Sequence, residues 1–186
     1  SAAHVDALSG IYGTVTARGD DRVPDDILQD TLDKFGDAMS EDEKQAFMAV
    51  YADSGPSADR VTEVRGNAGL VLSYLADRLV EIMPGAAQRP VLLGGEDVFS
   101  LTGLGALTLM ERLNGGPGRY CGTEAAFDDL AVSVDGFCVT TGTAGVRALD
   151  GSDERFAGRT LTVRPEPYRP EGEMDRFVSQ VLGERA

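Results

Sequence analysis

The sequence predicts an α+β fold, in which a helical N-terminal half is followed by a small antiparallel β-meander with a C-terminal helix packed on it. Three observations predict this fold. Apolar residues recur at helical spacing in the first half, they alternate as in strands in the second half, and an apolar stripe closes the chain. At 186 residues a single domain over 1–186 is expected, with 1–85 mainly helical and 86–186 mixed α/β.

Two short helices are predicted near the start of the chain. Pro24 and the two aspartates that follow it suit the N-terminus of a helix over residues 23–35. A second helix is predicted over residues 40–51, where Ser40 and Glu43 have the spacing of a capping box. Both segments place their aliphatic residues along one face, as expected for helices that pack on a core.

A longer helix is predicted over residues 58–83. Valine, leucine and isoleucine recur there at intervals of three and four, and Pro84-Gly85 ends the pattern. Gly66 and Gly69 fall inside this segment, and they are interpreted as a kink or as a point where another element approaches closely.

The second half contains one strong hairpin signal. Asp135-Gly136 supplies the two residues that a type I′ turn prefers, between apolar runs over 131–141. This register pairs Val134 with Phe137 on one face of the hairpin.

The rest of the meander is predicted from two short apolar runs. Residues 145–151 and 159–167 are expected to form strands, and prolines end the second one. The stripe within residues 171–185 predicts the C-terminal helix, which Gly183 stops.

The net charge of −14 limits the class of partner. A surface of this sign repels phosphate backbones and the basic residues are scattered, so no nucleic-acid binding is expected. No apolar run is long enough to cross a bilayer, which predicts a soluble, cytoplasmic protein without a membrane partner. Cys121 and Cys138 are expected to be reduced thiols, with a single bridge between them as the less favoured alternative.

Gly94-Gly95-Glu96-Asp97 is the first candidate site. These four residues resemble the glycine-glycine-acidic hairpin of nucleotide cyclases, and that resemblance implies a divalent cation held against a phosphorylated substrate. The segment that follows, residues 98–113, has the pattern of a helix, whereas that family's fold needs a strand there. The favoured interpretation is a turn whose Glu96 and Asp97 stabilise a helix N-terminus.

The glycine-rich stretch 115–122 is the second candidate site. It carries Arg119, Tyr120 and Cys121, and a cation two residues from a thiol can favour the thiolate. The only histidine is His4, so a cysteine nucleophile would lack its usual base. A plain loop is the favoured interpretation.

These observations favour a non-catalytic domain. We expect an acidic regulatory, sensory or accessory protein that binds a protein partner or a small molecule without a cofactor or metal, and a homo-oligomer stays open. The residues that could contact a ligand are Glu96, Asp97, Arg119, Tyr120 and Cys121. One alternative is a divalent-metal-dependent enzyme that acts on a phosphorylated substrate through Glu96 and Asp97. A further alternative is a secretion- or assembly-type chaperone.

Overall fold

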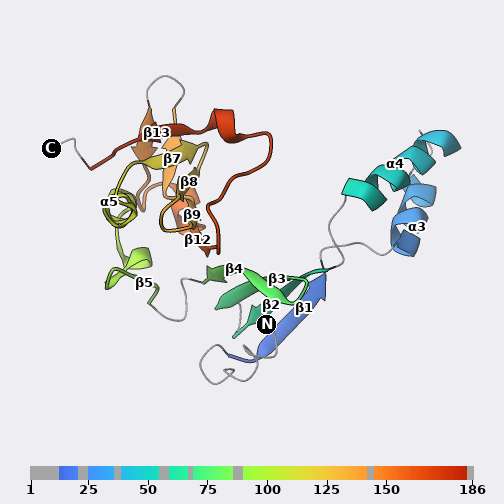
Figure 1. Cartoon of the computed structure of the whole chain (residues 1–186), viewed down its shortest axis with the longest axis horizontal. Helices are drawn as coiled ribbons and strands as arrows, with labels where there is room; N and C mark the ends of the chain where they lie inside the picture. Colours follow the sequence, from blue (N-terminus) through green and yellow to red (C-terminus); the bar gives the residue numbers. More distant parts are fainter. Residues whose placement is uncertain are drawn as a thin grey trace.

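The structure is a computed structural model, and it contains a nine-stranded antiparallel sheet (Figure 1). The residues that it describes are 13–20, 25–35, 39–54, 59–66, 69–85, 90–141 and 145–183. The strands of the sheet are β1 (Val15–Asp20), β2 (Arg60–Arg65), β3 (Leu70–Leu75), β4 (Arg78–Pro84), β7 (Gly118–Cys121), β8 (Glu124–Phe127), β9 (Val132–Asp135), β12 (Thr160–Val163) and β13 (Val178–Gln180). Their order across the sheet is β1-β2-β3-β4-β12-β9-β8-β7-β13.

The remaining elements are short. The helices among the described residues are α3 (Asp25–Phe35), α4 (Glu41–Ser54), α5 (Gly103–Asn114) and α6 (Glu154–Ala157), with 3₁₀ turns η1 (Val98–Ser100) and η3 (Met174–Arg176). Two small ladders complete the fold, β5 (Leu92–Leu93) with β6 (Glu96–Asp97) and β10 (Cys138–Thr140) with β11 (Val146–Ala148). The predicted fold class, with its helical N-terminal half, is therefore wrong.

The helix predicted over residues 58–83 is replaced by the antiparallel strands β2, β3 and β4. Gly66 has a φ of +56° and accepts a hydrogen bond from Gly69 N, so these glycines turn the chain instead of kinking a helix. Ala76 and Asp77, with φ of 47° and 60°, form the tight turn between β3 and β4. Valine and leucine residues fit both the helical and the strand periodicity, so the turns decide which of the two structures forms.

The hairpin predicted at Asp135-Gly136 is also wrong. Gly136 does have a positive φ of 76°. However, β9 pairs with β8 and β12, whereas β10 leaves the large sheet and pairs with β11. The turn is therefore a corner at which the chain passes from one sheet to another.

The C-terminal helix is absent as well. Residues 171–183 contain only η3 and the strand β13, which pairs with β7 at the edge of the large sheet. Because Val178 and Val181 are exposed, the apolar stripe does not pack as a helix face.

The two N-terminal helices are confirmed as α3 and α4. Ser40 N donates to Glu43 Oε2 at 2.7 Å, and Glu43 N donates to Ser40 Oγ at 3.3 Å, which is the predicted capping box. These hydrogen bonds hold the pKa of Glu43 below its usual value. Figure 1 shows both helices standing apart from the sheet, and Pro24 lies outside the described residues.

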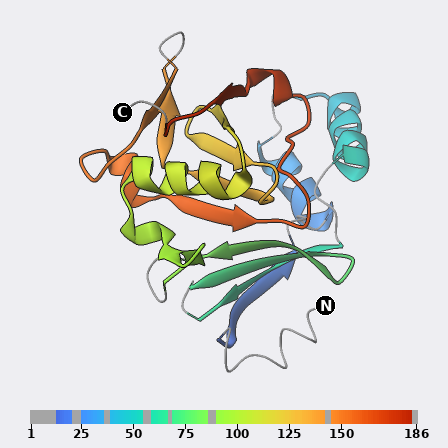
Figure 2. The same ribbon diagram turned by 60° about the vertical axis from the view of Figure 1, so that its left-hand side comes forward.

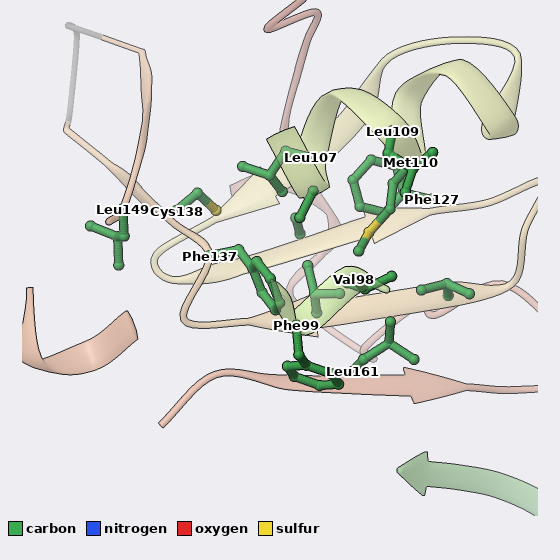
Figure 3. Packing of buried hydrophobic residues seen from close by; sticks show 14 of the residues in the cluster. Val98, Phe99, Leu107, Leu109, Met110, Phe127, Phe137, Cys138, Leu149 and Leu161 are labelled. Carbon is green, nitrogen blue, oxygen red and sulfur yellow. The ribbon is translucent and has the colours of Figure 1, made fainter. Parts of the chain in front are cut away.

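The main core lies between α5 and strands β7, β8, β9 and β12 (Figure 2). Leu107 and Met110 of α5 are fully buried and face Phe127 and Phe137, with Val98 below them (Figure 3). Thr102 Oγ1 accepts from Gly105 N and caps α5, and Gly115 ends the helix in the left-handed conformation. Burial of these side chains fixes one face of the sheet against the helix.

The opposite face of the sheet is polar. Residues that are paired across adjacent strands point to the same face. The register therefore brings Glu124, Asp135 and Thr160 to one side, and Ala125, Val134 and Leu161 to the side of α5. This polar face is where the candidate site lies.

Candidate functional site

A groove of about 200 Å³ is hollowed into the polar face of the sheet. Four strands and the segment after β12 supply its lining. We call it the polar groove, and its residues are Met83, Glu124, Ser133, Val134, Asp135, Thr160, Thr162, Arg164 and Tyr168. No local motif connects them, because neighbouring strands bring them together.

Two carboxylates face each other in the polar groove. Glu124 of β8 is directly opposite Asp135 of β9 in the ladder, and like charges at this position repel. The pKa of Glu124 is raised above its usual value by burial first, and then by the charges of Asp135 and Glu173. The groove therefore holds a carboxyl group whose ionised form is disfavoured.

Hydroxyl groups are the hydrogen-bond partners of these carboxylates. Thr123 Oγ1 donates to Asp135 Oδ1 at 2.5 Å, and the hydroxyl of Tyr168 hydrogen-bonds to Glu124. Throughout the described segments, neither Glu124 nor Asp135 forms an ion pair with a basic side chain. Their hydrogen-bond partners are thus neutral groups, although the charge of Arg164 also acts on Glu124 without an ion pair.

Arg164, which is the cation in the groove lining, is engaged elsewhere. Its Nε donates to Glu81 Oε1 at 2.9 Å, and its Nη1 donates to Ser133 Oγ at 2.6 Å. The guanidinium lies 4.5 Å from the centre of the Tyr168 ring. Glu81 also forms an ion pair with Arg60 of β2, so this carboxylate links Arg164 and Arg60 across the sheet.

Thr162 supplies a hydroxyl group without a hydrogen-bond partner in the described part of the protein. The relative exposure of the residue is 6%, and it lines the groove. Within the described part of the chain, its Oγ1 makes no hydrogen bond. This oxygen is not among the fully buried polar atoms that lack a partner, so it is open to the groove and available to an occupant.

Two wider hollows flank the first turn of α5. Their volumes are about 380 and 470 Å³, and both are lined by Thr102 and Leu104. Leu104 is half exposed, and each hollow is lined by a single carboxylate, Glu96 in one and Asp150 in the other. The polar groove is smaller, but it brings two carboxylates together.

Glu96 and Asp97 lie far from the polar face, in the β5–β6 hairpin beside α5. Glu96 Oε1 accepts from Arg112 Nη2 at 2.9 Å in an exposed ion pair. Asp97 Oδ1 accepts from Val91 N at 3.1 Å and from Phe99 N at 3.3 Å, so it caps η1. These contacts are structural, and ligand binding by either residue stays a prediction.

Asp97→Ala is expected to lower the free energy of unfolding by about 1 kcal/mol, because the cap of η1 is lost. Addition of MgCl₂ or MnCl₂ to the wild-type protein should leave the melting temperature unchanged, since a metal bound only to the native state would raise it. Calorimetry checks both results. A metal-dependent rise that Asp97→Asn abolishes would instead support the metal-dependent enzyme.

Arg119, Tyr120 and Cys121 lie on β7, and they do not converge on one site. Arg119 binds Asp128 through two nitrogens, at 3.2 and 2.7 Å, and its Nη2 donates to Tyr168 O at 2.6 Å. Cys121 is a free, partly buried thiol on the same face as Arg119. Neither residue lines the polar groove.

Tyr120 points to the other face and is fully buried in the core. Its hydroxyl donates to Glu111 Oε1 at 2.7 Å, and burial raises the pKa of the phenol above its usual value. The Glu111 carboxylate also accepts from Leu182 N at 3.0 Å, which fastens the segment after β13 to α5. Tyr120 is therefore part of the packing.

The second cysteine is a free thiol as well. Cys138 is fully buried, and its pKa is raised to about 12, by burial and then by the charge of Asp135. Such a thiol stays protonated and is a poor nucleophile at neutral pH.

The chain matches no protein-family model, no curated protein and no solved structure. In the described segments, no helix is both long and apolar enough to span a membrane.

Proposed function

We propose that the protein is a non-catalytic binding domain that takes up a small polar molecule in the polar groove. The observation that carries this proposal is the pair of facing carboxylates, Glu124 and Asp135, in a groove that the mostly buried residue Thr162 also lines. The Thr162 hydroxyl has no hydrogen-bond partner among the described residues. A ligand in the groove could therefore bind to the carboxylates and to this hydroxyl without displacing a contact within the protein.

The groove has features of a binding site rather than of a catalytic one. Neither thiol of the chain lines it, and its two acidic residues lie on the adjacent strands β8 and β9. Strands of a hydrogen-bonded sheet place side chains more rigidly than loops do, which favours selective recognition. A regulatory or sensory role, in which occupancy reports the concentration of the ligand, fits this arrangement. The free thiols fit a cytoplasmic location, which we include in the proposal.

Thr162→Val tests the proposal because it removes the hydroxyl and keeps the shape of the side chain. We expect the free energy of unfolding to stay within about 1 kcal/mol of the wild-type value, since no hydrogen bond within the described residues is lost. Binding in the groove should weaken at the same time. Denaturant unfolding gives the first result, and amide NMR titration with a library of small polar compounds gives the second.

Thr108→Val is the matched control. Thr108 is a partly buried threonine of α5, on the other side of the sheet. Its replacement should leave both the binding and the groove resonances unchanged. If no compound of the library shifts resonances of β8, β9 and β12, or if Thr162→Val destabilises the protein by 2 kcal/mol or more, about the size of a lost buried hydrogen bond, the proposal is wrong.

A further inference from the structure

We propose that the ligand of the polar groove is a small organic cation, held by a primary ammonium group between the carboxylates of Glu124 and Asp135. This inference rests on the proposed function, and it adds the chemical class of the ligand. The geometry comes from the ladder, which places the two residues directly opposite each other on the polar face.

The two facing carboxylates favour a positive occupant of the groove. Glu124 and Asp135 repel each other, Glu173 adds to this repulsion, and no described basic side chain forms an ion pair with either residue. The nearby guanidinium of Arg164 is bound to Glu81 and Ser133. A cation between the two carboxylates would convert their repulsion into attraction, and in a partly buried site this effect is larger than in water.

The number of donors favours an ammonium group. A primary ammonium has three N–H donors and no acceptor. The groove offers acceptors of these kinds on one face, namely the Glu124 carboxylate, the Asp135 carboxylate and the hydroxyl of Thr160, which is paired with Asp135. The hydroxyl of Thr162 lies two residues further along the same strand. Charge-assisted hydrogen bonds of this type are about twice as strong as neutral ones.

The lining also disfavours a metal ion. Over the described residues, no group of three or more His, Cys, Asp or Glu side chains is placed to hold one. Calcium takes six to eight oxygen ligands, more than two carboxylates and the neighbouring hydroxyls supply, whereas magnesium needs fewer protein ligands and is tested directly below. The side chains of Met83 and Tyr168, by contrast, provide apolar surface for the carbon atoms of an organic ligand.

The test uses n-butylammonium chloride as the probe, at constant ionic strength, with binding followed by amide NMR. Sodium butyrate, 1-butanol and MgCl₂ serve as anionic, neutral and inorganic comparisons. We expect the ammonium probe to shift resonances around the groove, and we expect Glu124→Gln and Asp135→Asn each to raise its Kd by roughly tenfold or more. Because each variant removes one of two facing charges, both should melt at or above the wild-type temperature.

Glu154→Gln is the control for the general attraction of cations to an acidic protein. Glu154 is exposed on α6, and this variant changes the net charge by the same amount as Glu124→Gln. Its Kd should equal that of the wild type, and an equal loss in all three variants would overturn the inference.

The remaining outcomes separate the two proposals. If butanol or butyrate binds in the groove and butylammonium does not, the ligand class is wrong, but the groove is still a binding site. If MgCl₂ produces the same shifts with higher affinity, the ligand is a metal ion and the inference of an organic cation is wrong. If no probe or library compound perturbs the groove, both proposals fail.

Discussion

Replacing Gly103 by alanine is expected to unfold the part of the sheet that α5 covers. Gly103 is the first residue of α5 and is buried. A Cβ atom on it would lie 2.2 Å from Leu149 O and 2.7 Å from Phe137 O. Both are backbone atoms, and Phe137 O already accepts from Leu149 N at 2.8 Å. Neither atom can therefore move away without disturbing this hydrogen bond.

The expected loss is more than about 3 kcal/mol, the upper part of the range for overpacked cores. Denaturant unfolding followed by near-ultraviolet circular dichroism measures it, because Tyr120 and the core phenylalanines report on this packing. Gly151→Ala is the matched control, since its Cβ would meet no atom within 4 Å and Gly151 does not have a positive φ. Equal unfolding midpoints for the two variants would show that the first residue of α5 does not pack closely against the backbone of Phe137 and Leu149.

Local signals in the sequence predict local structure well in this chain. Ser40 and Glu43 cap α4 as their spacing requires, and residues 98–113 form η1 and α5. These elements depend on contacts between residues three or four positions apart, which can be recognised without knowing the fold. The same holds for Gly136, since a type I′ turn requires the positive φ that this residue has, whereas the predicted pairing across the turn is wrong.

Long-range pairing could not be predicted in the same way. Residues 58–83 satisfy a helical pattern, yet the positive φ of Ala76 and Asp77 lets them form strands. Asp is common in such turns but Ala is not, so the pair Ala76-Asp77 lacks the Asn-Gly or Asp-Gly signal of a hairpin. The polar groove depends on this pairing. Its residues come from β4, β8, β9, β12 and the segment after β12, and each is unremarkable where it stands in the sequence. The sequence motifs led instead to Glu96, Asp97 and β7, where the described contacts are structural.

Arg65→Met is expected to lower the free energy of unfolding by about 3–5 kcal/mol, the cost of breaking a buried ion pair. Arg65 and Glu63 are neighbours on one face of β2, and both are fully buried. Arg65 donates from Nε at 3.1 Å and from Nη2 at 2.9 Å to Glu63 Oε2. Tyr74 OH donates to the same oxygen at 3.3 Å, while Arg18 approaches the other oxygen at 3.3 Å.

Glu63→Leu should be comparably destabilising, because it leaves a buried guanidinium with the Gly13 carbonyl among its remaining acceptors. The double variant Glu63→Leu/Arg65→Met should lose much less than the sum of the two single changes. It removes both charges together, and two apolar side chains of similar volume can occupy their place. Urea unfolding of all four proteins gives the coupling energy directly.

Arg112→Met provides the exposed comparison, since the side chains of Arg112 and Glu96 are 65% and 48% exposed. Its cost should stay within about 1 kcal/mol, because solvent screens an exposed pair. If the losses in the double variant simply add, Glu63 and Arg65 are each held by other groups and do not stabilise the sheet as a pair. A loss in the double variant far below the sum of the two single losses would instead show that the charged pair fixes the position of β2 against β3. These strands lie in the half of the sheet that α5 does not cover.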